Sequence, residues 1–294
     1  MTGTPDAPVQ VAALQYCAAG TAAETLPFLL PMITRAAEDG ATLVCLPEAA
    51  SFLAANRASL REEAETEGNS PTLDQLCHHA AGHGIAILAG SLMMRRREDD
   101  ALVNRTVLID ANGGVCAHYD KIHMFDANVG DGHRYRESDS FAAGNRMVLA
   151  DMAGMTIGLS ICYDLRFPGL YRGLARAGAR MLSIPAAFTF PSGKAHWHVL
   201  LRARAIETGC FVVAPAQCGT HADGRRTYGH AMIVSPWGEI LAEVPTDDTN
   251  AAAGANDGII HATLDPAAVA AARNAIPSLA SNPDFLRHPV RRRF

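Results

Sequence analysis

Short apolar segments alternate with longer amphipathic ones along this chain. The apolar segments predict buried strands, at Val9–Leu14, Thr42–Pro47, Ile85–Ala89, Met155–Ile161, Arg180–Pro185, Cys210–Pro215 and Gly258–Leu264. The amphipathic segments predict helices, at Thr25–Glu38, Ser70–His83, Pro168–Ala177 and Ala195–Thr208, with a short last helix that ends near Ala275. This alternation is typical of an α/β fold in which helices cover buried sheets.

Two further regions are predicted to form β-hairpins. Leu102–Asp110 and Val115–Asp120 flank an Asn-Gly-Gly turn, and Tyr228–Val234 and Glu239–Val244 flank a Pro-Trp-Gly turn. Hairpins pair antiparallel strands, so the sheets should be mixed. No interior linker divides the chain. We therefore expect a single domain over residues 1–294, with a short flexible N-terminus at about 1–8 and a C-terminal tail at about 276–294.

Composition narrows the possible partners. The chain has 294 residues, of which 49% are hydrophobic, and a formal net charge of −5. There is no basic excess to suit nucleic acid or an anionic membrane surface, and the basic cluster Arg291–Arg293 is short and lies at the extreme C-terminus. Met1–Val9 lacks the pattern of a signal peptide, and no apolar stretch is long enough to span a bilayer. We expect a cytoplasmic protein without nucleic-acid or membrane partners.

The cysteines do not form a recognisable framework. Their number, seven, is odd, and no two of them make a C-x-x-C pair. Neither a disulfide scaffold nor a zinc site is predicted. Most of these thiols should be small buried side chains, so the question is whether one of them differs.

A first candidate for chemistry is Glu48, in Val44-Cys45-Leu46-Pro47-Glu48. The carboxylate follows a buried strand, and strand carboxyl ends are where α/β folds place their sites. Removal from water would raise its pKa and make it a base near neutrality. The alternative is a glutamate that caps a helix beginning near Ala49.

A second candidate is Lys121, in Tyr119-Asp120-Lys121-Ile122-His123. It follows the second strand of the first hairpin. The alternative is an ordinary solvated lysine, and His123 is equally well explained as a polar residue at the start of a loop.

A third candidate is Cys162, which lies between an apolar strand and the helix that begins at Pro168. This resembles the strand–nucleophile–helix turn of other hydrolases. The backbone N–H of Tyr163 would be free to face a developing oxyanion. The alternative is one more buried cysteine, although the polar neighbours Asp164 and Arg166 argue against pure packing.

These three residues form a set that suits one reaction. A thiolate can add to an amide or nitrile carbon, while a cation and an N–H stabilise the charge on the heteroatom. A carboxylate can protonate the departing amine and then activate water. The sequence therefore predicts a cysteine hydrolase of carbon–nitrogen bonds, with Glu48, Lys121 and Cys162 as its catalytic residues.

At these residues the chain closely resembles the nitrilase superfamily, whose members carry a Glu, Lys, Cys triad in this chain order. The matches are Glu48 in Leu-Pro-Glu, Lys121 in Asp-Lys-Ile-His and Cys162 in Ile-Cys-Tyr-Asp-Leu-Arg-Phe-Pro. Glu137, in Tyr-Arg-Glu-Ser, matches a second glutamate that members often place near the lysine. Segments such as Arg204–Thr208 and Ala216–Gly219 resemble the Nit branch, and within it the deaminated glutathione amidases.

The resemblance implies a four-layer α-β-β-α sandwich, a homodimer or larger homo-oligomer, and neither cofactor nor metal. It implies an amidase that releases ammonia from a small carboxamide bearing a carboxylate, with deaminated glutathione as the best candidate. An omega-amidase, an N-carbamoyl amino acid amidohydrolase and a nitrilase are alternatives that share the triad. A catalytically silent relative that serves as a binding or regulatory subunit is an alternative of another class.

The resemblance also implies roles for individual residues. Cys162 would attack the amide carbon, Glu48 would act as base and acid, and Lys121 with the Tyr163 N–H would hold the oxyanion. Glu137 would position Lys121 or the substrate amide.

Several other residues are candidates for the pocket. Arg166 suits a substrate carboxylate, although a salt bridge with Asp164 or another local acid is an equal alternative. His196 and Tyr228 are further substrate-binding candidates, and His230 is a candidate for the pocket or a dimer contact. Residues predicted to be structural are Trp197, Arg202, Arg204 and Glu207. The loop Phe125–Glu137 should border the pocket, and it departs from the family pattern.

Overall fold

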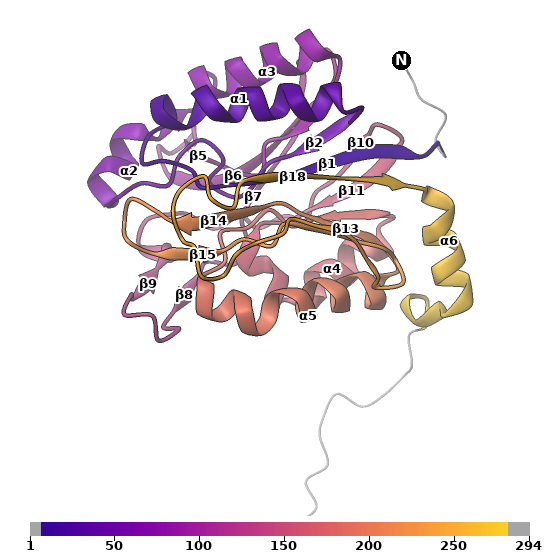
Figure 1. Ribbon diagram of the computed structural model, residues 1–294. Helices are drawn as coiled ribbons and strands as arrows, with labels where there is room; N and C mark the ends of the chain where they lie inside the picture. Colours follow the sequence, from indigo (N-terminus) through magenta and orange to yellow (C-terminus); the bar gives the residue numbers. More distant parts are fainter. Residues whose placement is uncertain (1–6, 282–294) are drawn as a thin grey trace, which may run out of the picture.

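The computed structural model describes residues 7–281, and it stacks two β-sheets face to face (Figure 1). Helices cover the outer face of each sheet. The first sheet is covered by α1 (Ala22–Glu38) and α3 (Pro71–His83), and the second by α4 (Pro168–Arg176) and α5 (Phe190–Thr208). The predicted α-β-β-α sandwich is confirmed.

The larger sheet has ten strands in the order β15-β14-β1-β2-β4-β6-β5-β3, with β18 paired to β1 and β7 paired to β6. The strands β1, β2 and β4 run parallel, whereas β6 is antiparallel to β4, β5 and β7. Their bounds are β1 Val9–Tyr16, β2 Leu43–Cys45, β3 Glu65–Thr66, β4 Ala86–Leu88, β5 Leu92–Arg95, β6 Leu102–Ile109, β7 Val115–Asp120, β14 Ala216–Thr220, β15 Arg226–Tyr228 and β18 Gly258–Leu264.

The smaller sheet has six strands in the order β10-β11-β12-β13-β16-β17, and only β11, β12 and β13 run parallel. Their bounds are β10 Leu149–Met152, β11 Met155–Leu159, β12 Met181–Ser183, β13 Phe211–Ala214, β16 Met232–Val234 and β17 Ile240–Glu243. A separate pair, β8 Asp126–Ala127 and β9 Tyr135–Arg136, forms a small hairpin. Both sheets are therefore mixed, as the predicted hairpins indicated.

Two apolar cores hold these layers together. Between the sheets, Val11 and Leu43 of the larger sheet share one cluster with Ile157 and Val212 of the smaller sheet. On the outer face of the larger sheet, α1 and α3 pack over a second cluster that includes Val44. Because both faces of β2 are buried, its sequence is continuously apolar rather than alternating.

Some predicted boundaries were wrong. Helix α5 begins at Phe190 rather than Ala195, because Pro191 suits a first helical turn. The strand predicted over Tyr228–Val234 is divided, since Gly229 and His230 have φ values of 72° and 57°. Short elements were missed: α2 (Arg57–Glu63), β3, β5, β8, β9, β10 and β14.

The sequence predicted an N-terminal segment at about 1–8 and a C-terminal tail at about 276–294. Ala7 and Pro8 precede β1, and the last predicted helix is present as α6 (Pro266–Ala275). Beyond α6, a short turn at Pro277–Leu279 is held by hydrogen bonds from Arg172 and Arg176. The rest of both predicted tails, with Arg291–Arg293, lies outside the described residues.

Gly90 allows the chain that follows β2 to pass close to the loop after β4. A Cβ atom at Gly90 would lie 1.9 Å from the Pro47 carbonyl oxygen, and the residue has a φ of +44°. The neighbouring Ser91 accepts a hydrogen bond from the backbone N–H of Ala49 through its hydroxyl. These contacts fix the backbone on both sides of Glu48.

We therefore expect Gly90→Ala to lower the free energy of unfolding by about 2–5 kcal/mol, because it adds a backbone clash to a left-handed conformation. It should also lower any activity that depends on Glu48. Urea unfolding measures the first effect. The matched control is Gly84→Ala, since Gly84 has a φ of +65° but open space around its Cβ position. Gly84→Ala should lower the free energy of unfolding by only about 1–2 kcal/mol. Equal losses of stability in the two variants would contradict the proposed clash at Gly90.

Candidate active site

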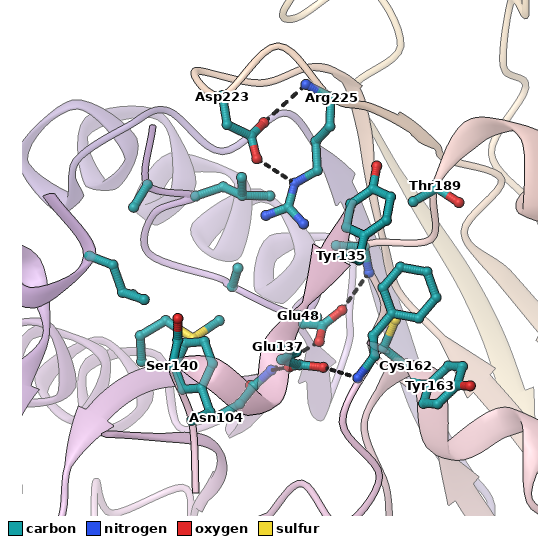
Figure 2. A pocket seen from close by; sticks show the side chains of 18 of the residues that line it. Glu48, Asn104, Tyr135, Glu137, Ser140, Cys162, Tyr163, Thr189, Asp223 and Arg225 are labelled. Atoms are coloured by element: carbon teal, nitrogen blue, oxygen red, sulfur yellow. Dashed lines mark hydrogen bonds and ion pairs between the residues drawn. The ribbon is translucent and has the colours of Figure 1, made fainter. Parts of the chain in front are cut away.

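The three residues predicted as catalytic meet at the floor of one pocket. Glu48 follows β2, Lys121 follows β7 and Cys162 follows β11, so the larger sheet supplies two of them and the smaller sheet the third. All three line a cavity of about 310 Å³. Figure 2 shows Glu48, Glu137 and Cys162 close together in it. Their meeting follows from the fold, because the ends of these strands lie at the same edge of the sandwich.

The Lys121 ammonium is held between two carboxylates. Its Nζ lies 2.8 Å from Glu48 Oε1, and 2.9 and 2.8 Å from the two carboxylate oxygens of Glu137. Only 2% of the Lys121 side chain is exposed. The alternative of a solvated lysine is therefore wrong.

Asn104 completes this charged cluster, and sequence reasoning missed it. Its Nδ2 donates to Glu48 Oε1 at 2.9 Å and to Glu137 Oε1 at 3.3 Å, and its carbonyl accepts from the Lys121 N–H. Asn104, Arg105 and Thr106 are three polar residues inside the fully buried strand β6. That run of polar residues in a buried strand was the available signal, because a buried amide needs partners.

Backbone contacts fix the second oxygen of Glu48. The N–H of Ala187 donates to Glu48 Oε2 at 2.9 Å, and Gln217 donates to the Glu48 carbonyl at 3.0 Å. No helix begins at Ala49, whose φ is 55°, so Glu48 is not a helix cap. Its carboxylate faces the pocket with both oxygens oriented.

Cys162 occupies a strained turn. Its φ is 47°, an uncommon value for a residue with a Cβ atom, and its N–H donates to the Pro185 carbonyl at 2.9 Å. A 3₁₀ helix follows at Cys162–Arg166. The N–H groups in the first turn of a helix have no carbonyl partner within that helix, and the N–H of Tyr163 is one of these.

Asp164 ties this turn to the end of β7. The carboxylate, which is fully buried, accepts from the Tyr119 hydroxyl at 2.7 Å, from His123 Nδ1 at 2.6 Å and from the Ile161 N–H at 2.9 Å. His123 is thus a partner of Asp164 at the start of a loop. The predicted alternative of an Asp164–Arg166 salt bridge is wrong.

Burial and charge set the protonation of the cluster. Burial raises the pKa of Glu48, but the charge of Lys121 and hydrogen bonds from Cys162, Lys121 and the Ala187 N–H outweigh it, so that this pKa lies below its usual value. The raised pKa expected from burial alone is wrong, because the neighbouring ammonium stabilises the ionised carboxylate. Burial also lowers the pKa of Lys121, yet the charges of Glu137 and Glu48 raise it well above its usual value.

The pKa of the Cys162 thiol is shifted in the direction opposite to that of Glu48. Burial and the negative charge of Glu48 raise the pKa of Cys162 well above its usual value, and the charge of Lys121 opposes them only in part. The resting site therefore contains a neutral thiol in the same pocket as the Glu48 carboxylate, whose own pKa is lowered.

The family model described as carbon–nitrogen hydrolase matches residues 10–274 of the chain. The chain belongs to the carbon–nitrogen hydrolase family. A relative from Synechocystis, named deaminated glutathione amidase, is 42% identical over 276 residues, which are 92% of this chain and 97% of that protein.

Solved structures agree in fold with this carbon–nitrogen hydrolase. The Caenorhabditis elegans NitFhit protein matches with a TM-score of 0.84 and 33% identity, over 94% of this chain and 65% of that longer protein. The Saccharomyces cerevisiae protein Nit3, described as a member of branch 10 of the nitrilase superfamily, matches with a TM-score of 0.80 and 26% identity, over 94% and 97% of the two chains. The predicted superfamily and Nit branch are confirmed.

Of the substrate-binding candidates in this carbon–nitrogen hydrolase, only Arg166 lines the pocket. Its guanidinium lies 5.1 Å from the centroid of the Phe188 ring and donates to His196 Nδ1 at 3.2 Å. His196 is exposed outside the cavity lining, and Tyr228 is buried against Phe190. The loop Phe125–Glu137 does border the pocket, through its two ends.

The residues predicted to be structural contact other parts of the fold. Trp197 is buried in the core, and Arg202 donates to the Gly238 carbonyl. Arg204 pairs with Glu207 at 2.9 Å and donates to the Leu165 carbonyl, so it also supports the turn that carries Cys162.

Among residues 7–281, one group has the composition of a metal site: His198, His230 and Glu243. Glu243 Oε1 lies 2.9 Å from His198 Nε2 and 2.6 Å from His230 Nδ1. These are hydrogen-bond distances, and the three residues are absent from the pocket lining. The group is therefore explained by direct His–Glu hydrogen bonds. In the described part of the chain, no helix is long and apolar enough to cross a membrane.

The charged cluster predicts a pH-dependent loss of stability in Lys121→Met. Removing the ammonium leaves two buried carboxylates facing each other, which should cost about 3–5 kcal/mol at pH 7. In the variant these two carboxylates would have pKa values above those of the unfolded chain. The loss of stability relative to the wild type should therefore shrink as pH falls towards 5 and the carboxylates become protonated.

In the wild type, the contribution of Glu48 to stability depends on pH in the opposite direction. It is present above the unfolded pKa of about 4.3 and is lost only as pH falls through the lower folded value.

Urea unfolding of both proteins at pH 7 and pH 5 measures this. Lys194→Met, at an exposed position, is the control and should change stability by no more than about 0.5 kcal/mol. A deficit of Lys121→Met that stays constant or grows towards pH 5 would exclude this account of the cluster.

Proposed function

We propose that this carbon–nitrogen hydrolase is an amidase that works through a thioester on Cys162. The observation that carries the proposal is that one carboxylate, Glu48, contacts the Lys121 ammonium at 2.8 Å and lines the same pocket floor as the Cys162 thiol. A base, a nucleophile and a cation so arranged are what acyl transfer from nitrogen requires. An intact set of this kind argues against the silent binding or regulatory relative.

The first half-reaction forms the thioester. Cys162 Sγ attacks the amide carbon as its proton passes to Glu48, and Lys121 with the Tyr163 N–H holds the charge on the carbonyl oxygen. Because Lys121 holds the pKa of Glu48 low, the protonated carboxyl is a strong acid towards the departing nitrogen. The carbon–nitrogen bond breaks and the amine leaves with that proton.

The second half-reaction restores the enzyme. Glu48, again a carboxylate, takes a proton from water as the water oxygen attacks the thioester carbon. The carbon–sulfur bond breaks, the acid product leaves and the thiol regains its proton. Glu137 acts on Lys121, which it contacts with both oxygens, and so serves as a positioning residue.

We propose a carboxylate-bearing amide, with deaminated glutathione as the best candidate, as the substrate. The Synechocystis relative carries that name. The cavity lining supports an anionic ligand: six cationic side chains against three acidic ones, 6 − 3 = +3, in a chain of net charge −5. The residues counted are Arg57, Arg134, Arg136, Arg166, Arg225, Lys121, and Glu48, Glu137, Asp223.

The amine released depends on the substrate. A primary carboxamide such as α-ketoglutaramate releases ammonia. In deaminated glutathione the amide nitrogen belongs to the cysteine of a cysteinylglycine unit, so hydrolysis releases that dipeptide, and the expected release of ammonia is wrong for this substrate. A panel of both compounds, an N-carbamoyl amino acid and a nitrile separates the proposed activity from the omega-amidase, carbamoylase and nitrilase alternatives.

We expect Cys162→Ala to abolish turnover, because the attacking atom is absent, and Glu48→Gln to lower kcat by about 10²–10⁴-fold, because proton transfer is lost. Acid-quenched wild type should carry the acyl group on Cys162 by peptide mass spectrometry. Cys116→Ala, which removes an exposed thiol, is the control and should keep wild-type rates. Amidase activity retained in Cys162→Ala would exclude the mechanism.

We also propose that the protein is a homodimer that associates through the outer face of α5 and the β16–β17 hairpin. Large apolar side chains are exposed there: Val199 by 68%, Ile206 by 55% and Trp237 by 56%. Ile206 packs on Gly238, so the helix and the hairpin form one continuous surface. A surface of this kind is typical of an interface.

The cytoplasmic location, the single domain and the absence of a nucleic-acid partner stay predictions.

Val199→Glu combined with Trp237→Glu should convert a dimer into a monomer, since each change places a charge in the apolar interface. Light scattering after size exclusion gives the mass. Val115→Glu, at a position 52% exposed on β7, is the control and should leave the mass unchanged. A wild-type monomer, or a dimer in the double variant, would contradict this interface.

A further inference from the structure

Two arginines at the mouth of the pocket have no assigned partner for their guanidinium ends. Arg225 lies in the turn between β14 and β15, and Arg134 directly precedes β9. Both line the same cavity as Cys162. Figure 2 shows Arg225 across the pocket from Glu48 and Glu137, with its guanidinium directed towards them.

Asp223 fixes the stem of Arg225 but leaves its tip free. Asp223 accepts from the Arg225 backbone N–H at 3.0 Å, and its other oxygen lies 3.0 Å from Arg225 Nε. Among residues 7–281, the terminal nitrogens of Arg225 donate no hydrogen bond, and Arg134 makes neither a hydrogen bond nor an ion pair. A guanidinium that is oriented but unpaired suits a planar carboxylate.

A row of contacting aromatic rings runs from Arg166 towards the mouth arginines. Tyr135 stands next to Phe125 with ring centroids 4.9 Å apart, and Phe125 next to Tyr163 at 5.1 Å. The Arg166 guanidinium lies 5.9 Å from the centroid of the Tyr163 ring, whereas Arg134 directly precedes Tyr135 in the chain and Figure 2 shows Arg225 on the Tyr135 side of the pocket. The two cationic regions therefore suit two different carboxylates rather than one.

The order of the reaction assigns each region to one part of the substrate. The acyl group stays bonded to Cys162 while the amine departs, so the amine must lie on the solvent side. Arg166 is four residues beyond the nucleophile in the same turn, whereas Arg134 is exposed and the Arg225 side chain is 25% exposed. The mouth arginines are therefore on the side through which the amine leaves.

We propose that Arg134 and Arg225 form a second anion subsite that binds a carboxylate on the leaving amine. This inference rests on the proposed amidase function and deepens it. The preferred substrate is then an N-substituted amide with a carboxylate on each side of the scissile bond, such as an oxoacyl dipeptide. A primary amide, which releases ammonia, leaves this subsite unused.

The test compares two substrates across variants. In Arg225→Ala and Arg134→Ala, kcat/KM for deaminated glutathione should fall about tenfold to hundredfold, mainly through KM, since a charge-assisted hydrogen bond is lost. The value for α-ketoglutaramate should stay within about twofold. Arg225→Lys should lose less than Arg225→Ala. The control is Arg226→Ala, because the adjacent Arg226 lies over the Phe190 ring at 3.7 Å and outside the pocket lining.

A substrate change makes the test specific. Replacing the terminal carboxylate of deaminated glutathione by a carboxamide should slow the wild type as much as the mutations do, and the mutations should then cause no further loss. Equal losses for both substrates in the arginine variants would overturn the subsite, as would undiminished activity on deaminated glutathione.

Failure of the function itself is distinguishable. If the wild type hydrolyses neither compound, the proposed function is wrong, and calorimetry on the Cys162→Ala background decides the subsite. Weaker binding of intact deaminated glutathione when Arg225→Ala is added would support the subsite. Unchanged affinity would overturn it.

Discussion

The burial of the Lys121 ammonium between Glu48 and Glu137 is the interaction on which the rest of the site depends. Each of these charges costs several kcal/mol to remove from water, and the cost is offset only when every hydrogen-bonding position is filled. Asn104 and the Ala187 N–H fill the positions that remain on Glu48, and the Phe125 N–H donates to Glu137. The cluster thereby determines the path of three separate loops and the floor of the pocket.

A second buried carboxylate, Asp164, holds in place the turn that carries the nucleophile Cys162. It joins the turn after β11 to the end of β7 and so links the smaller sheet to the larger one. The positive φ of Cys162 is maintained by this network, together with Arg204 on the Leu165 carbonyl. Strain at a nucleophile persists only when its surroundings over-determine it, and here both sides of the turn are held.

The sequence predicted the features that depend on local patterns and missed those that depend on contacts between residues far apart in the chain. Strands such as β1 and helices such as α3 carry local patterns, with Ser70 accepting a hydrogen bond at the start of α3 and Gly84 left-handed at its end. Glu48, Lys121 and Cys162 were predictable because each follows a strand and matches a family motif. The pairing of Asn104 with Glu48 and of Asp164 with Tyr119 could not be predicted, since these partners lie 56 and 45 residues apart in the chain. Elements of two to four residues, such as β8 and β9, are too short to show a period.

The division of the triad between the two sheets has a mechanical consequence. Glu48 and Lys121 follow strands of the larger sheet and Cys162 follows a strand of the smaller one, so the reactive centre lies where the two sheets meet. Any sliding of one layer over the other changes the separation of base and thiol directly. The apolar layer between the sheets thus acts as the spacer that sets the distance for proton transfer, and its packing is part of the catalytic geometry.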